Sequence, residues 1–238
     1  MTYDYLLFLL VLFCTIYLSV KKEKLTLAGA ITGGVIVSFL FIGAGFTGVF
    51  MLGVFFLAGT LATTWKINTK ELVGVAESNG GKRTAGQVIA NGGVAGIAGL
   101  LAGIFPNQQD LFLLMMAAAI SSAISDTLSS ELGTVYGKRF YNILSFKQDK
   151  RGENGVISIE GTIFGVTGAS IIAAIYAARF GWNKQVSWIV IAGTMGNISD
   201  SILGATLERK GIIKNDTVNF LNTFIAALVV LYCLNFFK

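Results

Sequence analysis

The sequence contains no histidine, and only 13% of its 238 residues are charged. The absence of histidine removes the commonest zinc ligand and the usual general base. Any acid–base or metal chemistry must therefore use carboxylates, amides, hydroxyl groups, lysine or arginine. Soluble domains carry about 25% charged residues, whereas 54% of this chain is hydrophobic. This composition predicts a polytopic membrane protein.

Cysteines and nucleotide-binding signatures are also scarce. The two cysteines, Cys14 and Cys233, lie inside the first and last apolar runs. Cysteine in such places generally behaves as a small hydrophobic residue, so we predict neither a disulfide nor a reactive thiol. The sequence has no Walker A pattern, no glycine-rich kinase loop with its lysine and no zinc signature. The first apolar run is followed by the basic segment 21–24 and not by a small-residue cleavage site, so we predict a retained helix.

Apolar runs predict an all-α fold, a polytopic membrane bundle of about eight transmembrane helices in a single domain, residues 1–238. Each run is close to the roughly 20 residues that cross a bilayer as a helix. The longest loop is expected at residues 133–160. The predicted spans are 3–20, 25–43, 46–64, 86–104, 111–130, 161–179, 186–206 and 218–237.

Basic residues segregate to one side of this topology. Only Arg179, Lys184 and Lys238, of the 18 lysines and arginines, fall on the other side. The positive-inside bias makes the basic side cytoplasmic and places both termini outside. It also accounts for the net charge of +5, so we predict no nucleic-acid partner. We expect a protein of a prokaryotic plasma membrane whose site faces the cytoplasm, because the polar motifs lie in the basic loops.

A short acidic motif occurs twice in apolar surroundings. Ile-Ser-Asp followed by threonine or serine stands at Ile124–Thr127 and at Ile198–Ser201. Each copy follows a glycine-rich helix, and the two copies have the same orientation in the predicted topology. We interpret the pattern as a parallel internal repeat of spans four–five and six–seven, with units at 81–135 and 155–210. Chance similarity is the alternative.

The motif places Asp126 and Asp200 inside membrane spans. A carboxylate there costs roughly 2.5–3.5 kcal/mol on insertion scales, so it seldom lacks a partner. We predict that the two residues converge on a divalent cation, and oxygen ligands favour Mg²⁺. The alternative is a pair of structural carboxylates hydrogen-bonded to neighbouring helices. Glu131 joins Asp126 only if its helix ends or bends near Gly133; otherwise it is a solvated carboxylate.

Residues before the fourth span have the parts of a phosphate-binding entrance. Lys82 and Arg83 precede Asn91 at a helix start whose N–H groups and positive dipole end favour anions. Along the last span, an amide stripe follows one helix face. We assign its Asn219 to the site and its Asn222 to helix–helix contact.

Five ordered motifs resemble those of the integral-membrane "domain of unknown function ninety-two" family, which includes the plant phytyl-phosphate kinase of tocopherol synthesis. The resemblance runs over nearly the whole chain from about residue 25. One segment departs from the family form, because residues 153–158 read Glu-Asn-Gly-Val-Ile-Ser where members often have Thr-Asn-Gly-Gly-Val-Ser. The motifs are Arg83–Gly93, Ser125–Gly133, Gly152–Gly155 with Glu160–Thr162, Gly196–Thr206 and Asn215–Phe220.

The resemblance implies a Mg²⁺-dependent kinase that uses a nucleoside triphosphate, with CTP as the expected donor, and an isoprenoid (phytyl or prenyl) monophosphate as acceptor. The isoprenoid tail would lie between helices inside the membrane, and membrane lipid would be the surrounding partner. Asp126 and Asp200 would hold the metal and act in catalysis with Lys82 and Arg83. The expected substrate-binding residues are Asn91, Glu131, Asn154, Asn197, Ser201 and Asn219.

Three other functions stay open. A CTP-dependent cytidylyltransferase acting on a lipid phosphate would release pyrophosphate in place of a nucleoside diphosphate. An ion-coupled secondary transporter would also use paired carboxylates and internal repeats. Transport is disfavoured because the acidic residues lie near one face of the membrane. A scaffold without chemistry is disfavoured because the polar motifs gather on one side.

Overall fold

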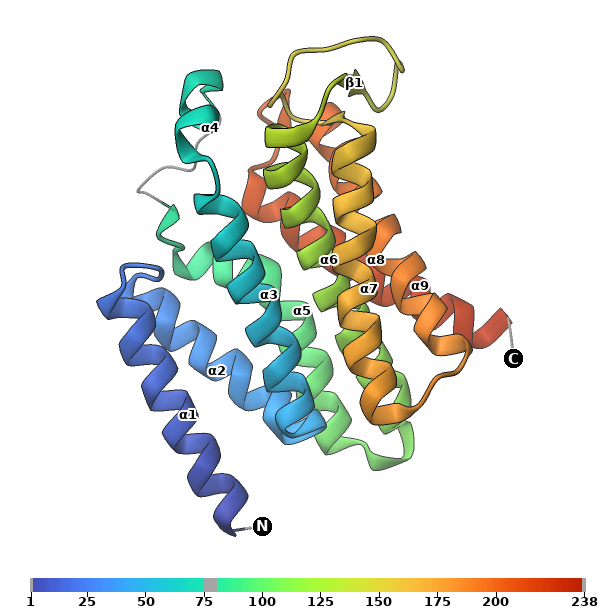
Figure 1. The fold of residues 1–238 in the computed structure, drawn as a ribbon. Helices are drawn as coiled ribbons and strands as arrows, with labels where there is room; N and C mark the ends of the chain where they lie inside the picture. Colours follow the sequence, from blue (N-terminus) through green and yellow to red (C-terminus); the bar gives the residue numbers. More distant parts are fainter. Residues whose placement is uncertain (1, 75–80, 237–238) are drawn as a thin grey trace.

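The computed structural model describes residues 2–74 and 81–236, which form a bundle of helices (Figure 1). A loop between α6 and α7 carries two short antiparallel strands, β1 (Tyr141–Asn142) and β2 (Val156–Ile157). A turn of 3-10 helix precedes α6, and a π-helical turn, Gly204–Glu208, continues α8. The helices are α1 (Thr2–Lys21), α2 (Leu27–Ala44), α3 (Phe46–Thr64), α4 (Ile67–Val73), α5 (Ala85–Ile104), α6 (Gln109–Tyr136), α7 (Ile159–Phe180), α8 (Lys184–Leu203) and α9 (Asn215–Phe236).

The all-α prediction and its membrane spans are confirmed. Within the described ranges, eight helices are long and apolar enough to cross a membrane, and each overlaps one predicted span. The fifth differs most, because it extends over Pro106–Tyr136 and shortens the loop that was expected from residue 133. The sequence pattern did not predict α4, since seven largely polar residues give no periodic signal.

Helix α6 is the central element of the bundle. It packs against α3, α5, α7, α8 and α9, and it is the most deeply buried of the spanning helices within the described residues. Small residues make this possible, because alanine and serine let neighbouring backbones approach closely. On α8, side chains at Gly193 and Gly196 would overlap Ser121 and Ser122 of α6. This close packing places the acidic ends of α6 and α8 side by side.

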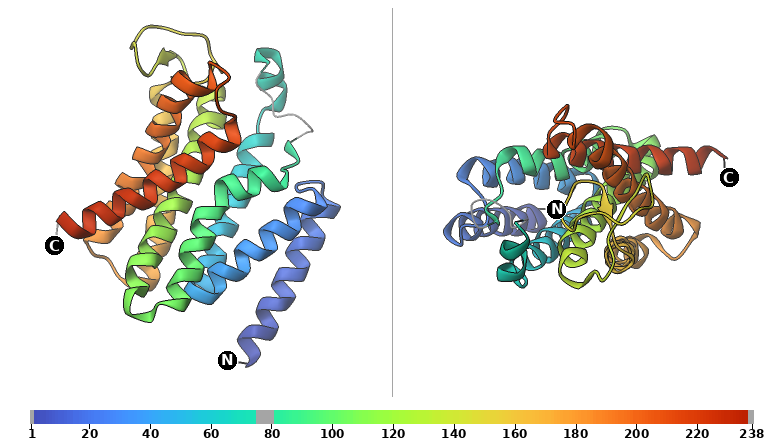
Figure 2. Two further views of the ribbon diagram at one scale, coloured as in Figure 1. Left: turned by 180° about the vertical axis from the view of Figure 1, so that it is seen from behind. Right: turned by 90° about the horizontal axis from the view of Figure 1, so that it is seen from above.

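Helix α1 lies at the edge of the bundle, packed mainly against α2 (Figure 2). It is the least buried of the spanning helices within the described residues, and large apolar side chains such as Leu10 and Phe13 are exposed. Apolar atoms on the outside of a spanning helix face lipid in a bilayer. Cys14 on α1 is exposed and Cys233 on α9 is buried; both thiols are free.

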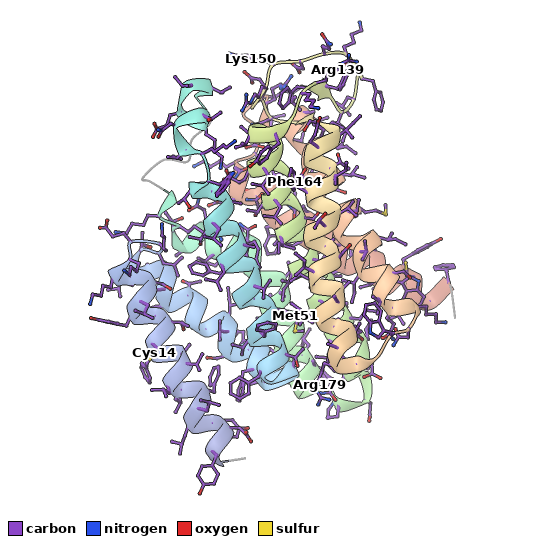
Figure 3. The ribbon with its side chains drawn as sticks, in the orientation of Figure 1. Cys14, Met51, Arg139, Lys150, Phe164 and Arg179 are labelled. Atoms are coloured by element: carbon purple, nitrogen blue, oxygen red, sulfur yellow. The ribbon has the colours of Figure 1, made fainter. Side chains whose placement is uncertain are left out.

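Basic side chains lie at opposite ends of the bundle in unequal numbers. Arg139 and Lys150 lie in the loop between α6 and α7 at one end, while Arg179 lies at the other (Figure 3). Lys238 falls outside the described residues, as do Met1 and Phe237. The cytoplasmic orientation of the loop end, the location of both termini and the internal duplication stay predictions.

Candidate functional site

A polar cavity of about 310 Å³ lies at the loop end of the bundle. Its walls come from the start of α5, the end of α6, the end of α8 with its π-helical turn, and the start of α9. Residues 152–158 of the loop and Lys70 of α4 complete the lining. Seen from above, the loop lies over the helix ends (Figure 2). The fold therefore gathers the five motif segments of the sequence around one cavity.

Asp126 and Asp200 meet in this cavity. Their carboxyl groups lie within hydrogen-bonding reach of each other, one on α6 and one on α8. The buried Asn222 amide of α9 donates to Asp200 Oδ1 at 2.8 Å, and Ser122 Oγ donates to Asn222 Oδ1 at 3.0 Å. Asn222 thus joins helices as predicted, and it also fixes the position of Asp200.

Neither carboxylate has a basic partner in the part of the chain that the structure describes, where the ion pairs are Lys70–Glu131, Lys82–Glu23 and Arg209–Asp149. Glu208 lies near enough to add its charge to that of both aspartates. Two adjacent carboxylates repel each other, and a shared proton or a cation removes that repulsion. The pair therefore fits either a proton shared between the two carboxyl groups or a cation from outside the chain.

The donor set fits Mg²⁺ better than a resident transition metal. Among residues 2–74 and 81–236, no group of three histidine, cysteine, aspartate or glutamate side chains is arranged to hold a metal. Mg²⁺ usually keeps several waters and binds through one or two carboxylates together with substrate phosphates. Asp126 and Asp200 supply two carboxylates, and the Asn197 amide, which also lines the cavity, supplies a neutral oxygen.

The side chain of Arg83 lies against α3 and lines the cavity. Its guanidinium carbon lies 5.4 Å from the centre of the Phe55 ring and 5.9 Å from that of Phe56. A side chain at Gly59 would start 2.6 Å from Arg83 Nη2 and 3.3 Å from Thr127 of α6. Gly59 therefore leaves the space through which the guanidinium approaches the residue next to Asp126.

Lys82 does not line the cavity. Its Nζ lies 3.8 Å from Glu23 Oε1 in an exposed pair, and such pairs contribute little to stability. Of the two basic residues predicted at the entrance, only Arg83 lines the cavity that holds the aspartates.

The six residues predicted to bind substrate all line the cavity: Asn91, Glu131, Asn154, Asn197, Ser201 and Asn219. Two of them also bond within their own helix. Asn91 Nδ2 donates to the Gln87 carbonyl at 3.0 Å, and Ser201 Oγ donates to the Asn197 carbonyl at 3.3 Å. Their roles in binding stay predictions.

Glu131 is held differently from either expectation. Helix α6 continues past Gly133 and ends at Tyr136. The carboxylate accepts a hydrogen bond from Thr63 Oγ1 at 3.0 Å and forms an ion pair with Lys70. Glu131 therefore lines the cavity while it is bound to the α3–α4 region, and its charge still acts on Asp126.

Lys70 is the main residue that the sequence pattern missed. It is 1% exposed, and its ammonium group donates to the Ala62 carbonyl at 2.6 Å and the Thr63 carbonyl at 3.0 Å. Buried lysine is rare unless it is paired. Because Glu131 lies 61 positions away, no local signal in α4 could predict this burial.

The start of α5 is closed by its own side chains. Thr84 and Gln87 form a capping box, in which each side chain accepts a backbone N–H of the other residue. A side chain at Gly86 would start 2.7 Å from Asp216 Oδ2, so a carboxylate of α9 already lies beside this terminus. The Gln87 N–H group is therefore not available to an anion, and the phosphate-binding entrance at this helix start stays a prediction.

The loop over the cavity is tied to the α8 end. Arg209 Nη1 donates to Asp149 Oδ2 at 2.9 Å, and the Asn142 amide donates to the same oxygen at 3.2 Å. The backbone N–H of Lys150, followed by Arg209 and Asn142, lowers the pKa of the exposed Asp149 carboxyl. Nearer the cavity, the Asn154 side chain lies within hydrogen-bonding reach of Glu208.

Comparisons with known proteins support one family assignment. The family described as integral membrane protein DUF92 matches residues 10–227. The uncharacterized membrane protein MJ0933 of Methanocaldococcus jannaschii is 31% identical over 227 residues, which cover 94% of this chain and 93% of that protein. Protein VTE6, chloroplastic, of Arabidopsis thaliana is 31% identical over 201 residues, which cover 79% of this chain and 58% of that protein. No solved structure matches.

The contact between Gly59 and Arg83 predicts the effect of adding a side chain on α3. Gly59→Val would displace the Arg83 guanidinium, so the affinity for anionic ligands such as nucleoside triphosphates should fall by about tenfold, the effect of losing one charge-assisted hydrogen bond. Isothermal titration of the purified protein checks this. The matched control is Leu61→Val, which places the same side chain on the exposed face of α3. Equal affinity in both variants would contradict the assigned path of Arg83.

The Asp149 contacts predict a pH-dependent closure of the loop. Because the folded-state pKa of Asp149 is lowered, its stabilising contribution is present above the unfolded pKa of about 3.9. That contribution is lost as the pH falls through the folded value. Asp149→Asn should therefore speed amide exchange in residues 140–157 at pH 7, and this difference from the original protein should vanish in acid. A difference that does not shrink as the pH falls below the unfolded pKa of about 3.9 would rule out the carboxylate as its cause.

Proposed function

This chain belongs to the integral membrane protein DUF92 family, and we propose that it is a membrane-embedded kinase. It would transfer a phosphoryl group from a nucleoside triphosphate, CTP by preference, to an isoprenoid monophosphate such as phytyl phosphate. The observation that carries the proposal is the pair Asp126–Asp200, which shares a polar cavity with Arg83 at one end of an apolar bundle.

The reaction needs few catalytic groups from the protein. An oxygen of the acceptor phosphate attacks the γ-phosphorus of the donor, the bond from that phosphorus to the β–γ bridging oxygen breaks, and the nucleoside diphosphate leaves. The attacking oxygen is already anionic, so no general base is required. Catalysis then consists mostly of positioning and charge neutralisation. A chain without histidine, with carboxylates and a guanidinium in one cavity, suits this chemistry.

Each group in the cavity has a distinct task in this proposal. Asp126 and Asp200 would hold Mg²⁺, which would supply positive charge to the donor phosphates. Arg83 binds and orients the phosphate that is transferred, since a guanidinium binds phosphate with several parallel hydrogen bonds. The amides of Asn91, Asn197 and Asn219 orient phosphate oxygens, and Lys82, which does not line the cavity, takes no part.

The loop over the cavity would limit water at the reacting phosphates. Water in the site would otherwise compete with the acceptor and hydrolyse the donor. Asn154 and its neighbours bring the loop against the α8 end, so the loop could close over a bound nucleotide. Ser201 and Glu131 would contact the donor from the two sides of the cavity. We place this end of the protein in the cytoplasm of a prokaryotic cell, where CTP is available.

A labelled-donor assay tests the activity. Purified protein with Mg²⁺, geranylgeranyl phosphate and γ-labelled CTP should yield labelled prenyl diphosphate. With α-labelled CTP, the label should stay in CDP. Release of pyrophosphate together with a CDP-lipid would instead indicate cytidylyl transfer.

Substitution of either aspartate tests the site. Asp126→Asn and Asp200→Asn should each lower turnover by about 100-fold or more, since even outer-shell changes at a metal site cost 10–100-fold. The matched control Asp110→Asn removes an exposed carboxylate at the opposite end of α6 and should keep full turnover. Normal turnover in both cavity variants would reject the site, provided that the original protein is active.

A further inference from the structure

A second cavity, of about 160 Å³, adjoins the polar one and differs from it in character. It lies between α1, α2, α3 and α5, and most of its lining residues are apolar. Nothing in the proposed phosphoryl transfer accounts for such a cavity, because nucleotide and metal both need polar surroundings.

Three residues line both cavities: Arg83, Gln87 and Asn91. They form the wall between a polar space that holds the two aspartates and an apolar space between membrane helices. A ligand that occupies both spaces must carry a charged or polar head joined to a hydrocarbon chain. Because the two cavities adjoin at these three residues, a ligand that reaches from one into the other has to be an amphiphile.

Arg83 lies where the polar head of that ligand would join its hydrocarbon chain. One side of its guanidinium approaches Thr127 and the polar cavity. The other side lies against the rings of Phe55 and Phe56, which both line the apolar cavity. An acceptor phosphate that lies next to the transferred phosphoryl group at Arg83 would therefore have its ester carbon beside these two rings.

We propose that the apolar cavity holds the first isoprene units of the acceptor's hydrocarbon chain. The inference rests on the proposed function and deepens it, because it names the helices that contact the hydrocarbon chain of the acceptor. A volume of about 160 Å³ is close to that of an engineered cavity of about 150 Å³ that binds benzene. The cavity therefore takes only the part of the chain next to the phosphate. The remainder extends past α1, which packs mainly against α2, into lipid.

Two glycines allow the cavity to be filled by substitution. A side chain at Gly53 of α3 would meet no heavy atom within 4 Å, and one at Gly33 of α2 would meet only Val88 Cγ1 at 3.8 Å. Both glycines line the apolar cavity. A large side chain at either position would occupy the space proposed for the isoprenoid chain without displacing the protein backbone.

The experiment compares Gly53→Phe with Leu57→Phe, which places the same ring on the lipid-exposed face of α3. Gly53→Phe should raise KM for geranylgeranyl phosphate by about tenfold, the effect of losing two buried methylene groups. The KM for CTP should not change. Thermal stabilisation by geranylgeranyl phosphate should fall in this variant, while stabilisation by CTP with Mg²⁺ should persist. Gly33→Leu, on a different helix, should behave in the same way.

The outcomes separate the two proposals. If the original protein transfers phosphate and both glycine variants keep its KM for geranylgeranyl phosphate, the chain-binding cavity is rejected and the kinase stands. If the original protein neither turns over nor is stabilised by any prenyl phosphate, the proposed function itself fails. A tenfold effect in Leu57→Phe as well would show that the ring acts through the bilayer, which would also reject the cavity.

Discussion

Two adjacent carboxylates inside an apolar bundle repel each other, and the arrangement of this protein depends on that constraint. Helices α6 and α8 approach closely because glycines on one meet serines on the other, and this contact brings Asp126 and Asp200 together. Asn222 then holds Asp200 in place with a 2.8 Å hydrogen bond. Packing that serves stability alone would gain more from apolar residues here, since an uncompensated buried charge is costly. The proposed Mg²⁺ ion would offset the charge of this pair.

The cavity also explains why polar residues from distant segments share one end of the bundle. Arg83 enters from the α5 start, Glu131 and Lys70 form the wall towards α3, and the loop after α6 forms the roof. An apolar cavity continues from Arg83 between α1, α2 and α3. A phosphorylated lipid has its head and chain in the same order, from water into membrane. The proposed chemistry and the proposed binding site for the hydrocarbon chain both follow from the change from a polar cavity to an apolar one at Arg83.

Local properties of the sequence explain what could be predicted. Span lengths follow from apolar runs, and Asp126 could be singled out because a carboxylate in such a run is costly. Tertiary contacts explain what could not. The burial of Lys70 depends on Glu131, 61 positions away, and the contact between Asn222 and Asp200 depends on how α8 meets α9. The end of α6 was placed too early because its last turns are polar, and only the pairing of Glu131 shows that they are packed.

Metal binding tests the central claim most directly, independently of turnover. Mn²⁺, a spectroscopic substitute for Mg²⁺, should bind to the purified protein in about one equivalent when CTP is present, as followed by electron paramagnetic resonance. Asp126→Asn and Asp200→Asn should each abolish that binding, while Asp110→Asn should not, because the proposed site holds the ion through the two cavity carboxylates and the donor phosphates. Undiminished Mn²⁺ binding in both cavity variants, or none by the original protein with CTP, would contradict the account.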